Sequence, residues 1–334
     1  MELIQLKKQG YDPYIDFIKG LCIIAVVFTH ALPSVIKDVS LFCLWGEMAV
    51  PIFLLIQVFH AYKQGLDCSK PILTLKIFKR IIIPFVITLT IILGGKSICH
   101  SEDWIANAQK MFMGGGGPGS YYPWIYVQFA VVLALLRPIL KKISFTKIVI
   151  LFVLFSILIE ILLSYIHLSP SVYRMMFIRY TFLILLALDW INNGFKIDFK
   201  RIVLSVIGLV SILIFHYTNI NMEPIFNNNA WHDFHWICYF WVAYALTWLI
   251  GCVYSKIQET KFVKKVIIPA GVGSYEIFLV QMAVFALFPQ HSFVVLDSKV
   301  TNFALWFALV VLLSLMPVIL YQNFKRGRCA QKNR

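Results

Sequence analysis

Two ionisable residues, Lys19 and His30, lie within the first long apolar stretch of the chain, which runs from Tyr14 to Ile36. Eleven residues of α-helix make about three turns, so both side chains would lie on one face, separated by a rise of roughly 16 Å. With Lys19 at one membrane surface, His30 would lie near the middle of a hydrocarbon core about 30 Å thick. A neutral imidazole is the ionisable group best suited to proton transfer at that depth, so we predict that His30 is catalytic.

Each of these residues also has a purely structural explanation when it is taken alone. Asp16 precedes Lys19 by three positions and can pair with it along the helix, while Lys19 could simply extend toward the headgroups. His30 could pack against another helix through a hydrogen bond. Their placement on one face, with Pro33 just beyond His30 to loosen the helix, favours a functional role.

A basic cluster, LKIFKRIIIP, precedes Pro84 in a later apolar stretch. Lys76 and Lys79 fit the ordinary excess of positive charge on the cytoplasmic side of a membrane. Arg80 lies one turn before Pro84, where a helix would enter the membrane, and its guanidinium matches the geometry of phosphate oxygens. We predict that an anionic cofactor from the cytoplasm meets Lys19 and Arg80.

Further polar and aromatic residues interrupt apolar segments or flank them. Glu276 and Gln281 lie in GSYEIFLVQMAVF and could bind substrate or simply hydrogen-bond neighbouring helices. Tyr122 and Trp124 follow a glycine-rich run and could form a sugar-stacking surface or an interfacial aromatic belt. His232, in WHDFH, could meet an extracellular substrate, bind a metal together with His235, or be an interfacial polar residue.

The composition places all of these residues in a membrane protein. The chain has 334 residues, of which 60% are hydrophobic and only 14% are charged, whereas soluble domains carry about 25% charged residues. We predict an all-α, polytopic integral membrane protein with about ten transmembrane helices. The expected spans are roughly 14–36, 41–62, 73–94, 122–140, 146–167, 176–192, 202–217, 234–255, 266–288 and 302–322.

The distribution of charge sets the expected topology. The net charge is +14, yet with the N-terminus in the cytoplasm 24 of the 30 Lys and Arg residues fall in inner segments. The outer exceptions are Lys37, Lys96, Lys110, Arg174, Arg179 and Lys299. Both termini are therefore expected to be cytoplasmic, and the basic charge requires no nucleic acid partner. We expect a single domain, 1–334, ending in a basic cytoplasmic tail at 323–334.

Several alternative chemistries lack their sequence signatures. The seven cysteines contain no C-x-x-C pair, so neither a disulfide framework nor a metal site is expected. No P-loop and no G-x-S-x-G motif is present. The H-x-x-x-x-D motif of glycerolipid acyltransferases is also missing, because Val35 stands five positions after His30.

The segment IDFIKGLCIIAVVFTH resembles the opening of the membrane-bound acyltransferase 3 family, in which an acidic residue, a basic residue and a histidine have the spacing of Asp16, Lys19 and His30. KRIIIP resembles the basic segment before a proline in the family's third helix. This chain has Lys19 where arginine is frequent and Ile77 where an earlier arginine is frequent, so that Lys76 or Lys79 would supply that charge.

The segments PIFLLIQVFHAY, GPGSYYPWIYVQF and GSYEIFLVQM are similar to the subgroup called surface polysaccharide O-acyltransferases, although many members have histidine where this chain has Gln281. The resemblance implies transfer of an acyl group, usually acetyl, from cytoplasmic acyl-CoA to a hydroxyl of a surface sugar or polysaccharide. The basic, Ile- and Phe-rich composition is consistent with a bacterial inner membrane. Lys19, Arg80, Lys76 and Lys79 would then bind acetyl-CoA. Glu276, Gln281, Tyr122, Trp124 and His232 would bind the acceptor.

His30 would act as a general base or would carry the acetyl group itself, and the sequence leaves both routes open. The competing hypothesis is a transporter or flippase for a glycolipid or polar solute, and a membrane sensor without chemistry is a third. A transporter built from inverted repeats would show discontinuous helices in paired halves, and the sequence shows no such repeat.

Overall fold

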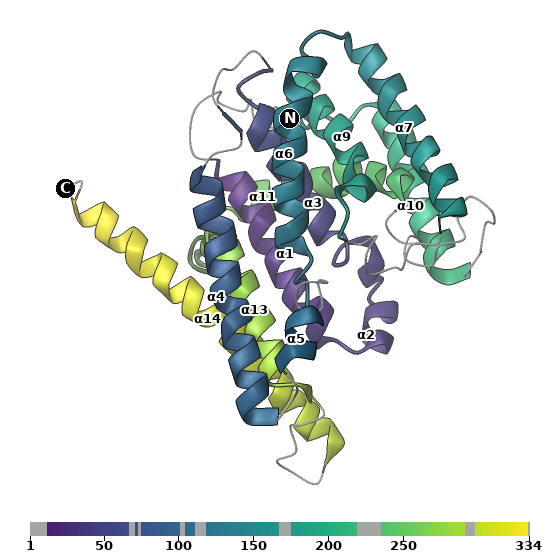
Figure 1. Cartoon of the computed structure of the whole chain (residues 1–334). Coiled ribbons are helices and arrows are strands. Elements are labelled where there is room, and N and C mark those ends of the chain that lie inside the picture. Colours follow the sequence, from purple (N-terminus) through teal and green to yellow (C-terminus); the bar gives the residue numbers. More distant parts are fainter. Residues whose placement is uncertain are drawn as a thin grey trace. The chain divides into compact units, whose positions relative to one another are not determined.

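The computed structural model of the chain describes residues 12–66, 71–72, 75–100, 104–110, 118–166, 175–218, 235–290 and 298–332 (Figure 1). All regular secondary structure within these ranges is helical, which confirms the predicted all-α class. Eight helices among the described residues are long and apolar enough to cross a membrane, or nine if one sharply bent pair forms a single span. The polytopic architecture is therefore as predicted.

The expected span at 176–192 is the place where the structure differs. A short 3-10 helix, Phe177–Tyr180, leads into helix α9, Phe182–Asn193, which has only 12 residues. A helix of 12 residues rises about 18 Å and is too short to cross the hydrocarbon core alone. Eight of its 12 residues are buried, so its apolar composition reflects packing inside the protein.

The chain divides into two compact units. Unit 1 comprises Met1–Asp12, Cys43–Leu75 and Trp124–Val253, and unit 2 comprises Pro13–Phe42, Lys76–Pro123 and Tyr254–Arg334. The main helices of unit 1 are α3 (Ala49–Tyr62), α6 (Tyr122–Leu140) from Trp124 onward, α7 (Phe145–Tyr165), α9, α10 (Phe199–Thr218) and the first part of α11 (Thr247–Ile257). Those of unit 2 are α1 (Pro13–Ala31), α2 (Ser34–Val39), α4 (Leu75–His100), α5 (Trp104–Lys110), α12 (Ile268–Val272), α13 (Ser274–Leu287) and α14 (Lys299–Lys332).

Helix α1 is shorter than the apolar stretch that contains it. It ends at Ala31, and Pro33 begins the connection to α2. Proline disfavours the helical conformation of the residue before it, which explains the early end. His30 therefore occupies the last turn of α1 rather than the interior of a helix extending to Ile36.

Two glycines bring the backbones of α1 and α12 into contact in unit 2. A Cβ atom added to Gly271 would collide with the carbonyl oxygen of Asp16, and one added to Gly20 would collide with the carbonyl oxygen of Ile267. Small residues permit such close helix approach within a membrane. The residues just before α12, Val263–Ile267, form a π-helix, and Asn323 donates a hydrogen bond of 2.8 Å to the Lys265 carbonyl in it.

Helix α13 contacts each of the other long helices of unit 2, α1, α4 and α14. It follows α12 after a bend of 79°. Helix α4 runs parallel to it, because Tyr275 contacts Ile81 near both N-termini and Leu287 lies against Gly95 near both C-termini. Helix α14 runs antiparallel, with Val318 beside Gly273 at one end and Trp306 beside Phe285 at the other.

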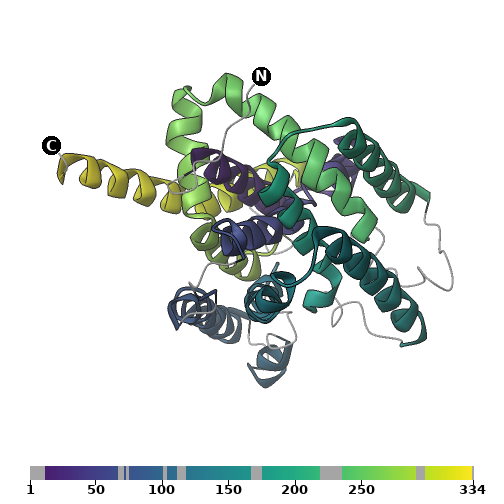
Figure 2. The same cartoon turned by 90° about the horizontal axis from the view of Figure 1, so that it is seen from above.

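The C-terminal residues continue α14. We expected a basic tail at 323–334, and the helix extends through Lys332 without a break. Figures 1 and 2 both show this last part of α14, in yellow, projecting beyond the other helices of unit 2.

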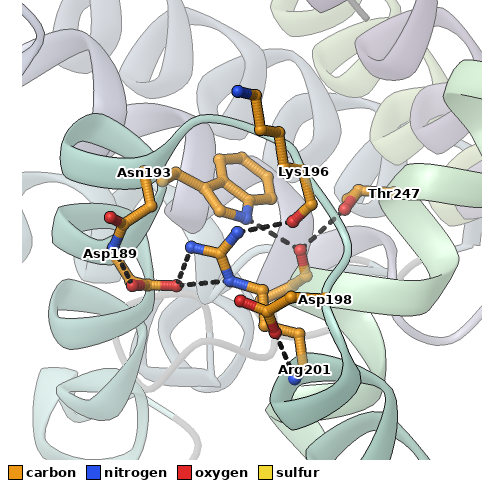
Figure 3. Close-up of polar contacts among 8 residues, drawn as sticks. Asp189, Asn193, Lys196, Asp198, Arg201 and Thr247 are labelled. Atoms are coloured by element: carbon orange, nitrogen blue, oxygen red, sulfur yellow. Dashed lines mark hydrogen bonds and ion pairs between the residues drawn. The ribbon is translucent and has the colours of Figure 1, made fainter. Parts of the chain in front are cut away.

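A buried arginine ties together three elements of unit 1, and Figure 3 shows its hydrogen bonds to Asp189 of α9. The Arg201 guanidinium donates to Asp189 Oδ2 from Nε at 3.1 Å and from Nη2 at 2.8 Å, and it lies over the ring of Tyr244. Asp198 caps α10 by accepting from the Arg201 backbone N–H at 2.8 Å. Arg201 is thus a structural anchor between α9, α10 and the π-helix Trp241–Leu246, and its charge is locally neutralised.

Replacing Gly271 by Ala should destabilise unit 2, because the added methyl group must push the α1 backbone away at Asp16. Overpacking of this kind typically costs about 1–3 kcal/mol. We expect a lower thermal unfolding temperature of the detergent-purified protein. Gly94→Ala is the matched control, since a Cβ added at that α4 glycine has no neighbour within 4 Å. Equal unfolding temperatures for the two variants would contradict the predicted backbone contact.

Candidate functional site

Lys19 is held at the start of unit 2 by an ion pair within its own helix. Its Nζ lies 2.6 Å from Asp16 Oδ1, and the Asp16 carboxylate is largely buried. The backbone of Asp16 is in turn fixed against Gly271 of α12. Lys19 itself is half-buried, so its ammonium group combines a fixed position with partial access to solvent.

Arg80 lies at the beginning of α4, at the end of unit 2 where α1 and α13 also begin. Pro84 removes the helix hydrogen bond that the Arg80 carbonyl would accept, which weakens this turn. The Tyr275 hydroxyl donates a hydrogen bond of 2.6 Å to the next carbonyl, that of Ile81, and so attaches the turn to α13. Arg80 and Lys79 are both exposed, as a binding role for an anion requires. Lys76 lies in the same helix, and its side chain is outside the described part of the structure.

Glu276 lies at this same basic end. It is in the first turn of α13 and is exposed. A carboxylate in that position is favoured by the partial positive charge of the helix N-terminus, so it needs no buried partner. The structure thus places Glu276 near the beginning of α13 and His30 near its C-terminal half.

The imidazole of His30 lies against an aromatic wall at the opposite end of α1. Its ring centroid is 6.0 Å from that of Phe285, in an edge-on arrangement, and the Phe285 ring contacts Trp306 of α14. The Trp306 indole N–H donates to the Phe288 carbonyl at 2.9 Å, which fixes the wall. His30 is half-buried, so its imidazole is partly shielded yet reachable.

Gln281 and Tyr122 lie on the side of α13 that also holds Phe285. Gln281 is completely buried and donates a hydrogen bond of 3.1 Å to the Pro118 carbonyl, while the Tyr122 ring lies 5.5 Å from that of Phe278. Residues 278, 281 and 285 follow helical spacing and form one face of α13. The structure therefore brings His30, Gln281 and Tyr122 to a common helix face.

Two further predicted site residues are Trp124 and His232. Trp124 is half-buried and belongs to unit 1. His232 lies outside the described residues, so its predicted role stays a prediction. Within the described ranges no group of three or more His, Cys, Asp or Glu side chains could hold a metal ion.

A second buried polar pair, outside this site, joins two elements of unit 1. His235 Nε2 is in ion-pair contact with Glu160 of α7, although the two atoms lack hydrogen-bond geometry. His235 Nδ1 accepts from the Ile237 backbone N–H at 3.3 Å, so a neutral ring carries its proton on Nε2, facing the carboxylate. The pair positions the start of the following span.

Sequence reasoning also missed Tyr275 and Phe285, which position the site. Tyr275 precedes Glu276 in the segment that drew attention for its polar residues, yet it supports a helix 194 positions earlier. Phe285 is one aromatic among 28 phenylalanines, and only its spacing of four from Gln281 sets it apart.

Comparisons with known proteins address the family directly. The sequence model of the acyltransferase domain family matches residues 12–322, nearly the whole chain. Comparison with curated proteins and with solved structures gave no match. The match covers every residue of the site described above, so the chain belongs to the membrane-bound acyltransferase 3 family and is a multi-pass membrane acyltransferase.

Proposed function

We propose that this protein moves an acetyl group from cytoplasmic acetyl-CoA to a hydroxyl of a surface sugar or polysaccharide, across a bacterial inner membrane. One observation carries the proposal. Two cationic side chains, Lys19 and Arg80, lie where α1 and α4 begin, and an imidazole lies at the other end of α1. An acyl donor whose charged phosphates lie at one end and whose reactive acyl group lies at the other matches the separation between these cationic side chains and the imidazole.

The donor would bind through its phosphates. Arg80 offers a planar fork of N–H groups, and Lys19 offers a compact charge whose position Asp16 fixes. Lys79, exposed on the same helix as Arg80, and Lys76 would add positive charge to the approach. The acyl-bearing arm of the coenzyme would then extend along α1 toward His30.

His30 would handle the proton or the acetyl group. In one route the imidazole takes the proton of the acceptor hydroxyl while that oxygen attacks the thioester carbon. In the other, the imidazole nitrogen attacks first, and the hydroxyl then displaces it from the acetyl carbon. In both, the C–S bond breaks, an ester C–O bond forms, and the hydroxyl proton ends on the thiolate of the released coenzyme.

The acceptor would lie on the face of α13 next to His30. The positions of Gln281 and Tyr122 on that face support this assignment. Roles for Trp124, His232 and Glu276 in acceptor binding are proposed from the sequence alone. An aromatic ring such as that of Tyr122 could pack against a sugar, with the polar groups setting its orientation.

One feature supports the alternative function of a transporter or flippase, namely the sharply bent helix pair α12–α13. Discontinuous helices of transporters recur in corresponding positions of two halves. The described residues contain a single bent pair of this kind. Acyl transfer is therefore the better supported function, and membership in an acyltransferase family favours it independently.

Replacing His30 by Ala should reduce acetyl transfer by about 10²–10⁴-fold, because general-base assistance is lost. The assay follows label from acetyl-CoA into surface glycans of membranes that contain equal amounts of folded protein. His60→Ala is the matched control, since His60 is exposed at the end of α3 in unit 1. Near-normal transfer by the His30 variant would remove the central assignment.

Replacing Arg80 by Ala should raise the KM for acetyl-CoA by about tenfold or more and change the KM for the acceptor little, because the lost contact is with phosphate. Lys200→Ala removes an exposed charge from unit 1 and serves as the control in steady-state kinetics. An equal rise of both KM values, or a rise for the acceptor alone, would argue against a phosphate contact.

A further inference from the structure

The two amide atoms of Gln281 have different surroundings. Nε2 donates a hydrogen bond of 3.1 Å to the carbonyl oxygen of Pro118. Oε1 is buried and has no hydrogen-bond partner among the residues that the structure describes. A buried acceptor without a partner is unfavourable, and in native proteins such a group usually has a specific reason.

The orientation of this amide is fixed by the turn that follows Pro118. Gly119 has a φ of +82°, which favours glycine, and a Cβ added there would press against the Phe278 ring. The Tyr122 backbone N–H donates to the Gly119 carbonyl at 2.8 Å, and the Tyr122 ring packs on Phe278. Rotating the Gln281 amide by half a turn would bring its oxygen against the Pro118 carbonyl. Oε1 therefore stays the amide atom that lacks a hydrogen-bond partner among the described residues.

This acceptor lies about one helical turn from the contact that holds His30. Gln281 and Phe285 are four residues apart on α13, which separates them by about 6 Å along the axis. The His30 ring packs on Phe285, and His30 is half-buried. His30 and Gln281 therefore both lie against the same part of α13.

We propose that Gln281 Oε1 accepts a hydrogen bond from a second hydroxyl of the acceptor sugar, next to the hydroxyl that His30 activates. This inference rests on the proposed acyl transfer and assigns part of its specificity. An amide oxygen can only accept, so it recognises a donor. Phosphate and thioester oxygens offer none. The amide N–H groups and the hydroxyl of the coenzyme's pantetheine arm are another source of a donor, and the test separates the coenzyme from the sugar.

The test combines two Gln281 variants with two kinds of acceptor. Gln281→Met keeps the length of the side chain but removes both polar atoms. Gln281→His restores one donor and one acceptor, because a neutral imidazole has one of each. The acceptors are methyl glucoside, methyl galactoside and methyl rhamnoside, each with its monodeoxy derivatives, and acetyl transfer from labelled acetyl-CoA is measured in detergent-purified protein.

For the wild type we expect that removing one particular hydroxyl of an accepted sugar lowers kcat/KM by about 10- to 100-fold. Gln281→Met should show the same loss with the intact sugar and no further loss with that deoxy sugar, since each change removes one side of the same hydrogen bond. Gln281→His should recover most of the lost transfer. The KM for acetyl-CoA should stay within about twofold in all three proteins.

Four results would overturn the inference, and the last of them would overturn the proposed function as well. In the first, every deoxy sugar lowers kcat/KM of the Met variant by the same factor as it lowers that of the wild type. The substitution would then deform the loop without removing a contact to the sugar. A raised KM for acetyl-CoA with unchanged acceptor kinetics would assign the contact to the pantetheine arm. Unchanged kinetics in the Met variant would leave Gln281 without a role in binding. Failure of the wild type to acetylate any sugar would overturn the proposed function and this inference together.

Discussion

The close approach of the α1 and α12 backbones is the constraint on which the geometry of unit 2 depends. Gly20 and Gly271 allow the contact, because any side chain at either position would meet a carbonyl oxygen of the other helix. The contact fixes Asp16 and therefore Lys19. Through the bend after α12 it also sets where α13 begins, and α13 in turn positions Tyr275 beside α4 and Phe285 beside His30. Both ends of the proposed site thus follow from one backbone contact.

Three pairs of ionisable side chains lie together in the described part of the protein. Arg201 pairs with Asp189, Lys19 pairs with Asp16, and Glu160 contacts the His235 ring. In a low-dielectric interior an isolated charge is very unfavourable, so local pairing is the condition for keeping ionisable groups there. Arg80 differs from these residues because it is exposed, and an exposed guanidinium group can be reached by an anion from outside the protein.

Much of the fold follows from the sequence, and the limits have a physical cause. Long apolar stretches predict helices that cross a membrane, and the spacing of Asp16 and Lys19 predicts their ion pair, because both depend on residues near one another in the chain. The contact of Gln281 with Pro118 joins residues 163 positions apart, which helical periodicity cannot indicate. Composition alone also made α9 resemble a span, since a helix buried in protein and one facing lipid are both apolar.

The central claim is that the acetyl group reaches the acceptor while the coenzyme stays on the side where it binds. The direct measurement uses sealed vesicles containing the purified protein, with acetyl-CoA carrying one label on the acetyl group and a second on the adenine, supplied to one face only. The account predicts that the acetyl label appears on saccharide at the opposite face and that the adenine label stays where it was added. Passage of both labels together, or of neither, would contradict it.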